Sequence, residues 1–211
     1  MVNLPEIFSY PYCLQDGVLV SADDIQEFNR KLTCLGCGST TVTLNSFGRP
    51  TFEHSLDKGQ NCNVQTAIQN ASKIAIQDGF NAAKAVGRKY LLVCVCEGCL
   101  KYLNYDLTES ADKAVLDFSS HGITRNPDVM FLDQDDLAVL TVQLVFDFAL
   151  ESEPYEEYRN FETPVFEVQP TWDAIEQFRS MHISGSHHRS KVVSVRIAQL
   201  SCLSCQQGKQ K

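Results

Sequence analysis

Four residues in the first third of the chain have the types and the spacing of metal ligands. They are Cys34, Cys37, His54 and Cys62. A Cys-x-x-Cys pair can place both thiolates on one ion when the chain turns tightly, and Gly36 and Gly38 supply that turn. A structural zinc ion takes four such ligands in a tetrahedron. We therefore expect a zinc-ribbon-like or knuckle site. The alternative is a histidine in a surface loop beside buried, metal-free cysteines.

Two more Cys-x-x-Cys pairs occur farther along the chain. Their members are Cys96 with Cys99 and Cys202 with Cys205. Each pair follows a segment that we expect to be a strand, residues 91–95 and residues 193–200. If these strands are neighbours, the four thiols meet and hold a second zinc ion. Cys94 lies on the same face of its strand as Cys96 and is the alternative ligand. Otherwise the two pairs are separate thiols.

The cysteine content and the charge limit the class of protein. The chain has nine cysteines, eight of them grouped, and only Cys13 stands alone as an expected small buried hydrophobic residue. The start of the chain lacks the features of a secretory signal, so we expect a cytoplasmic protein whose clustered thiols bind metal. No apolar run reaches the roughly 18 residues that a membrane-spanning helix needs. A net charge of −8 opposes general attraction to nucleic acid, although residues 187–211 are locally basic.

The elements that must position these residues alternate between strands and helices. Residues 12–20 resemble a β-hairpin with an Asp16-Gly17 turn. Residues 64–86 form the clearest helix, with small and apolar residues at helical spacing. A second helix covers residues 171–181, with Thr171 as its N-cap. The remaining expected elements are strands at 40–44, 90–96, 128–132, 137–148, 164–168 and 192–200, helices at 21–31 and 151–160, and a short helix or broken strand at 109–118.

This order of elements predicts a mixed α/β (α+β) fold in two parts. Residues 1–63 would form a hairpin and a small zinc-ribbon-like module. Residues 64–211 would form an α/β domain that carries the second cysteine cluster.

Several motifs together resemble the competence protein CoiA-like family. In the first part they are Asp16-Gly17-Val18-Leu19-Val20, Cys34-Leu35-Gly36-Cys37-Gly38, Phe52-Glu53-His54 and Cys62, followed by the long helix. In the second part they are Asn126-Pro127-Asp128-Val129 and Thr163-Pro164-Val165-Phe166-Glu167-Val168. The resemblance implies an N-terminal zinc-binding module followed by a restriction-endonuclease-like, mixed-sheet domain of the PD-(D/E)xK nuclease class.

The resemblance also assigns an altered active site. It makes Asp128 the aspartate that binds the divalent cation, commonly Mg²⁺, in such nucleases. Gln143 falls where the family carries a glutamate, and Val145 falls where it carries a lysine. A glutamine keeps an oxygen ligand but loses the charge that holds Mg²⁺. Asp147 lies on the same face as Gln143 and is the substitute acid.

Three functions follow from these observations. We favour a zinc-binding protein with a degenerate nuclease-like domain that binds DNA, RNA or a protein partner without catalysis. The second is an active divalent-metal-dependent nuclease that uses Asp128 and Asp147. The third is a redox or metal sensor centred on Cys94, Cys96 and Cys99. Nothing in the sequence sets the oligomeric state.

Overall fold

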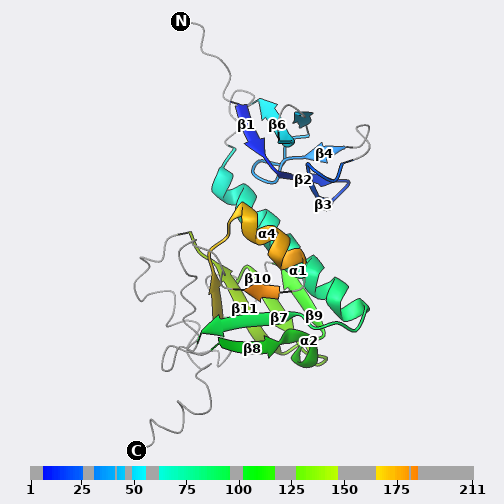
Figure 1. Ribbon diagram of the computed structural model, residues 1–211, viewed down its shortest axis with the longest axis vertical. Helices are drawn as coiled ribbons and strands as arrows, with labels where there is room; N and C mark the ends of the chain where they lie inside the picture. Colours follow the sequence, from blue (N-terminus) through cyan, green and yellow to red (C-terminus); the bar gives the residue numbers. More distant parts are fainter. Residues whose placement is uncertain are drawn as a thin grey trace, which may run out of the picture. The chain divides into compact units, whose positions relative to one another are not determined.

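The chain forms two compact units that join small sheets to helices. The computed structural model describes residues 7–25, 31–40, 42–45, 49–55, 62–95, 102–116, 127–146, 165–180 and 182–184. The units are Met1–Ile74 and Ala75–Lys211. Within the described residues there are four sheets and three helices, so the α+β class predicted from the sequence is confirmed (Figure 1). The predicted boundary between residues 63 and 64 stays a prediction, because helix α1 (Val64–Ala85) belongs partly to each unit.

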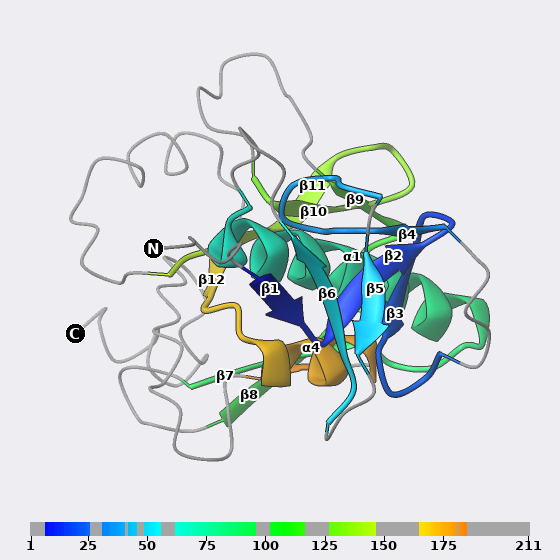
Figure 2. The ribbon, with the colours of Figure 1, turned by 90° about the horizontal axis from the view of Figure 1, so that it is seen from above.

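The first unit holds two three-stranded antiparallel sheets. One has the order β1 (Ile7–Tyr10), β6 (Thr51–Ser55), β5 (Thr43–Asn45), which lie side by side in Figure 2. The other has the order β3 (Val18–Ser21), β2 (Tyr12–Gln15), β4 (Leu32–Thr33). Asp16 and Gly17 connect β2 to β3 with φ of 51° and 87°. This left-handed pair is what a two-residue hairpin turn requires, so the predicted hairpin is confirmed.

A small apolar cluster connects the two sheets of the first unit. Its buried members are Cys13, Ala22, Leu32 and Phe52. Cys13 comes from β2 and Phe52 from β6, so the cluster draws on both sheets. Only 1% of Cys13 is exposed, as predicted for a small buried hydrophobic residue.

The helix expected over residues 21–31 is wrong at its start. Ser21 ends β3, and residues 22–24 form a turn. The Ser21 hydroxyl oxygen accepts a hydrogen bond from the backbone N–H of Asp23, at 3.3 Å. Serine makes such local bonds at turns as readily as at helix caps, and the sequence alone does not separate the two. Residues 26–30 lie outside the described residues.

The second unit is built on a four-stranded mixed sheet. Its order is β12 (Val165–Val168), β11 (Ala138–Leu144), β10 (Val129–Leu132), β9 (Lys113–Leu116). Strands β9, β10 and β11 are successively antiparallel, and β12 is parallel to β11. Every residue of β10 and β12 is buried, which is typical of strands covered on both faces.

A second sheet of this unit has three strands. Its order is β13 (His182–Ser184), β7 (Leu91–Val95), β8 (Tyr102–Asp106). Strand β13 is parallel to β7, and β8 is antiparallel to it. The sequence predicted β7 but neither β8 nor β13.

Helices α1 and α4 (Trp172–Arg179) pack closely within the second unit (Figure 1). A Cβ atom added to Gly79 of α1 would lie 2.1 Å from the carbonyl oxygen of Phe178 in α4. The same carbonyl accepts a hydrogen bond of 3.0 Å from the buried Tyr90 hydroxyl. Thr171 caps α4, because its hydroxyl oxygen accepts from the backbone N–H of Ala174 at 3.2 Å. The predicted cap is thus confirmed.

The other predicted elements have mixed outcomes. The ambiguous segment 109–118 contains both alternatives, since α2 (Leu107–Ser110) ends there and β9 follows. Of the apolar positions that the periodicity of α1 marks for burial, five are buried: Ala67, Ala71, Ala75, Phe80 and Ala83. Ile68 and Ile74 are only half-buried, and Val64 is exposed, so the prediction is wrong at these three positions. The expected helix at 151–160 and strand at 192–200 lie outside the described residues. Among the helices of the described part, none has the length and apolar content needed to cross a membrane.

Candidate metal centre

The four residues singled out in the first unit converge in space. One ligand atom from each of Cys34, Cys37, His54 and Cys62 lies within 4.8 Å of all the others. Cys34 Sγ lies 3.5 Å from Cys62 Sγ, and Cys37 Sγ lies 3.7 Å from His54 Nε2. A disulfide requires a sulfur separation of about 2.05 Å, so these thiols are free. The cluster can hold one metal ion.

The turn between Cys34 and Cys37 depends on both nearby glycines, for different reasons. Gly38 has a φ of 73°, which favours glycine, and its N–H donates to the Cys34 carbonyl at 2.9 Å. Gly36 has no room for a side chain. An added Cβ atom would lie 2.9 Å from the Asn63 carbonyl oxygen and 3.0 Å from Cys62 Sγ. Gly36 therefore lets the turn over residues 34–39, called the knuckle below, approach the third cysteine, Cys62.

The start of helix α1 positions Cys62. The next residue, Asn63, accepts hydrogen bonds from the backbone N–H groups of Gln65 and Thr66, at 2.8 Å and 3.4 Å. This is an N-cap arrangement, and it fixes the chain direction immediately after the ligand. About two turns beyond Asn63, the Asn70 side-chain amide donates to the Leu35 carbonyl at 2.8 Å. That bond ties the knuckle to the helix.

His54 lies on strand β6, and only 4% of it is exposed. Its register partner on β1 is Phe8, whose ring stacks on the imidazole at a centroid distance of 6.3 Å. The Tyr10 ring lies at 6.4 Å from the same imidazole. The alternative that placed this histidine in a surface loop is therefore wrong. The strand and the two aromatic rings hold the imidazole toward Cys37.

Burial raises the pKa of two of the thiols, Cys34 and Cys62. It raises the pKa of Cys34 to about 12, against the opposing effect of N–H groups donated by Gly36 and Cys37. The pKa of Tyr10 is raised by burial and by its hydrogen bond with Cys62. Metals bind cysteine as thiolate, so an ion that enters this cluster must displace protons from it.

The second unit contains a different buried polar cluster. Gln143 of β11 donates its side-chain amide to Asp128 Oδ2 at 2.6 Å, and the backbone N–H of Leu144 donates to the same oxygen at 2.7 Å. Glu167 of β12 is the register partner of Gln143. Directly paired residues on neighbouring strands place their side chains on the same face. Asp128, Gln143 and Glu167 are all buried.

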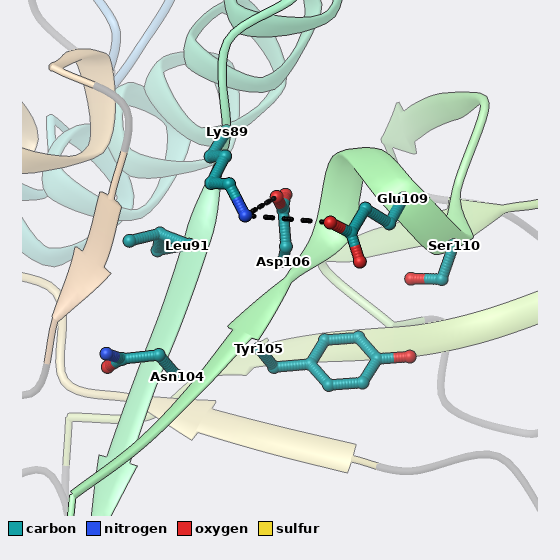
Figure 3. Close-up of a pocket in the computed structure, with 7 residues that line it drawn as sticks. All are labelled: Lys89, Leu91, Asn104, Tyr105, Asp106, Glu109 and Ser110. Atoms are coloured by element: carbon teal, nitrogen blue, oxygen red, sulfur yellow. Dashed lines mark ion pairs between the residues drawn. The ribbon is translucent and has the colours of Figure 1, made fainter.

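A hollow of about 500 Å³ lies beside strand β8 and helix α2 (Figure 3). The Lys89 ammonium lies between the carboxylates of Asp106 and Glu109, at 3.4 Å and 3.6 Å. Although burial opposes it, hydrogen bonds from Thr108 and the nearby Lys89 hold the pKa of Asp106 below its ordinary value. The Ser110 hydroxyl is buried and has no hydrogen-bond partner among the described residues. One ammonium and two carboxylates leave the lining of this hollow with a net charge of −1, and we assign no chemistry to it.

Several predicted site residues fall outside the described part of the chain. They are Cys96, Cys99, Cys202, Cys205 and Asp147. Cys94 belongs to β7, but only its backbone is described. The second zinc site and the role of Asp147 therefore stay predictions.

The sequence did not single out two residues that lie at these clusters. Tyr10 is 52 positions from the cysteine it contacts, and no spacing rule connects them. Glu167 was noted only as part of a family motif. A detectable signal was its place in the otherwise apolar run Val-Phe-Glu-Val, because a charged residue at the centre of a buried strand needs a polar neighbour.

No protein-family model, curated protein or solved structure matches this chain. Membership of the CoiA-like family therefore rests on the quoted motifs and stays a prediction.

Proposed function

We propose that the first unit is a zinc-binding module in which Cys34, Cys37, His54 and Cys62 hold one structural zinc ion. The ligand spacing carries this proposal. With Zn–S near 2.3 Å and Zn–N near 2.05 Å, a tetrahedron sets about 3.8 Å between sulfurs and about 3.6 Å between sulfur and nitrogen. The corresponding distances here are 3.5 Å and 3.7 Å. Four protein ligands leave no open position for a substrate, which is typical of structural sites.

Elemental analysis of the purified full chain tests this site. We expect two zinc ions per chain, one in the described cluster and one held by the two distant Cys-x-x-Cys pairs. His54→Ala should lower the count by one, and so should Cys202→Ser. A wild-type count of zero would refute the proposal. A count of one that Cys202→Ser leaves unchanged would eliminate the second ion only.

We further propose that the second unit is a nuclease-like domain without nuclease activity. Its mixed sheet agrees with the architecture that the resemblance implies. The Asp128 carboxylate already accepts two hydrogen bonds at one oxygen, from Gln143 and from the Leu144 N–H. An amide in place of the second acid removes a negative charge that Mg²⁺ prefers. The site is therefore better suited to holding strands together than to cleaving phosphodiesters.

One observation favours the active nuclease as a second candidate. Glu167 is the register partner of Gln143, so two buried carboxylates, Asp128 and Glu167, flank the amide. Asp128 directly precedes β10 and Glu167 belongs to β12, the two strands on either side of β11. Two carboxylates are a minimum set for a divalent cation. In this alternative, Glu167 joins Asp147 as a candidate for the missing acid.

A cleavage assay separates these two candidates. Single- and double-stranded DNA and RNA are incubated with Mg²⁺ or Mn²⁺ and the wild-type chain, Asp128→Ala or Gln143→Glu. We expect no cleavage by the wild-type chain. Cleavage that Asp128→Ala abolishes would establish the active nuclease.

In the absence of catalysis, we propose that the protein acts in the cytoplasm by binding DNA, RNA or a protein partner. The basic segment 187–211 is the first region to test, because cationic side chains dominate affinity for phosphates. Fluorescence anisotropy with labelled oligonucleotides should detect salt-dependent binding that is lost when residues 187–211 are deleted. Binding that survives this deletion would place the contact elsewhere.

A further inference from the structure

A tyrosine hydroxyl lies against one of the four candidate ligands. Tyr10 Oη and Cys62 Sγ are 2.6 Å apart, which is a close hydrogen-bond contact. Only 2% of Tyr10 is exposed, so water does not compete for this hydroxyl. The residue is held in place by strand pairing with Phe52 and by ring contact with His54. The position of the hydroxyl is thus set independently of Cys62.

The chemistry of a metal-bound cysteine decides the direction of this bond. A thiolate that ligates a metal has lost its proton and can only accept. The phenol must then donate its O–H to Cys62 Sγ. Three thiolates and one neutral imidazole around a divalent ion carry a net charge of −1, and a donated hydrogen bond offsets part of that charge.

Cys34 and Cys62 receive their donors from different sources. The Cys34 sulfur accepts from the backbone N–H of Gly36 at 3.3 Å. This N–H belongs to the main chain, so it does not depend on the identity of a side chain. The donor to Cys62 is a side chain from a distant strand, so a single substitution can remove it.

We propose that Tyr10 is a positioning residue of the metal centre, which orients the Cys62 thiolate and lowers its reactivity toward electrophiles. The inference rests on the proposed zinc site. Groups that hydrogen-bond to metal ligands fix ligand orientation and tune the metal, and their loss commonly costs about 10- to 100-fold in metal affinity. Tyr10 would protect Cys62, whereas Cys34 relies on the backbone N–H of Gly36.

The test compares Tyr10→Phe with the wild-type chain, and Tyr12→Phe is the matched control. Tyr12 is another buried phenol, two positions along the chain in strand β2. We expect Tyr10→Phe to lower zinc affinity by about tenfold or more in competition with a chromogenic chelator. In the Co²⁺-substituted protein, the thiolate-to-metal charge-transfer band should move to lower energy. In the zinc-loaded protein, iodoacetamide should alkylate Cys62 faster, while Cys34 keeps its rate, as resolved by peptide mass spectrometry.

The outcomes separate this inference from the zinc proposal. Zinc is first counted in the wild-type chain, and a count of zero refutes the proposed function itself. If the wild-type chain holds zinc and Tyr10→Phe matches it in affinity, band energy and Cys62 alkylation, the role of Tyr10 is refuted alone. A uniform rise in alkylation of all the ligands would show general loosening and would also refute a specific role.

Incorporation of 2,3,5-trifluorotyrosine at position 10 covers the case in which Tyr10→Phe does not fold. This analogue keeps the ring and strengthens the O–H donor. It should move the Co²⁺ charge-transfer band to higher energy, opposite to Tyr10→Phe. An unchanged band would overturn the inference.

Discussion

The two buried polar clusters of this protein provide partners for their polar groups in different ways. In the first unit, three thiols and an imidazole gather within 4.8 Å. In the second unit, the Asp128 carboxylate is met by the amide of Gln143 and by a backbone N–H. A buried polar group is costly unless it finds a partner. The second cluster contains its own hydrogen-bond donors. The first brings together three thiols and an imidazole, which can all bind one metal cation.

This contrast shows how one substitution can separate a metal site from a structural polar cluster. An amide offers both a donor and an acceptor, so it can satisfy a neighbouring carboxylate directly. A carboxylate in the same place would repel that neighbour and create a need for positive charge. Position 143 therefore decides whether the cluster of the second unit needs an ion.

The largest expected effect is the loss of the first cluster in Cys34→Ser. Apparent binding energies of structural zinc reach about 10–16 kcal/mol, and that energy stabilises the fold. We expect the variant to lose one zinc ion and most of its soluble yield. Elemental analysis and yield after centrifugation measure both effects.

Cys13→Ser is the control for that variant. Cys13 is buried in the apolar cluster of the same unit, and its replacement should cost about 1–3 kcal/mol by placing a hydroxyl there. It should keep its zinc. Equal damage from both substitutions would show that Cys34 acts only as a core residue.

Metal removal should affect the two units unequally. Chelation with EDTA should lower the melting temperature and expose the backbone N–H groups of residues 34–39. Those of Cys34 and Gly38 donate to backbone carbonyls within this turn. The strands β10 and β11 should keep their protection, since their cluster needs no ion. Hydrogen exchange read by mass spectrometry compares them. Equal loss of protection in both regions would mean that the ion stabilises the whole chain.

Gln143→Glu should make the stability of the second unit depend on a bound cation. Two carboxylates about 4 Å apart repel by about 4 kcal/mol at an effective dielectric constant of 20. The pKa of the introduced carboxyl would rise above its unfolded value. The destabilisation should therefore be full at high pH and should fade on acidification, as that carboxyl regains its proton.

Thermal melts of Gln143→Glu at pH 5 and pH 8, with and without Mn²⁺, measure this effect. We expect Mn²⁺ to raise the melting temperature of the variant at pH 8 and to leave the wild-type chain unchanged. A variant as stable as the wild-type chain at pH 8 without metal would contradict the role given to position 143.

The smallest expected effects are those of alanine substitutions at Gly79 and Gly36, two glycines that lack room for a side chain. Gly79→Ala would press a methyl group on the Phe178 carbonyl and should cost about 1–3 kcal/mol in the free energy of unfolding. Gly36→Ala would press on Cys62 Sγ and Asn63 and should weaken zinc binding as well. Denaturant unfolding and chelator competition distinguish them. A loss of zinc affinity in Gly79→Ala would contradict the assignment of this glycine to helix packing.

The sequence was sufficient where the physical cause is local. The Asp16-Gly17 turn, the Thr171 cap and the small residues along α1 each depend on a few neighbouring positions, and all were predicted. The convergence of Cys34, Cys37, His54 and Cys62 could be predicted too, because four residues of these types at close spacing have few other uses.

The sequence was insufficient where distant segments meet. Strand β6 places His54, and its short mixed-polarity segment Thr-Phe-Glu-His-Ser carries no strong strand signal. The contact of Tyr10 with Cys62 and the pairing of Gln143 with Glu167 depend on strand register. Register is set by tertiary packing as well as by local pattern, so these partners became visible only in three dimensions.

The position of the ligand set along the chain has a consequence for biosynthesis. Tyr10, the knuckle, His54 and Cys62 all precede helix α1, and every strand of the second unit follows it. The ribosome therefore releases a complete set of ligands before it has made any of the four-stranded sheet. Since domains fold in order of emergence, the nascent N-terminal unit can capture its ion while the remainder is still being translated. Zinc supply during translation would then govern how much of the chain matures correctly.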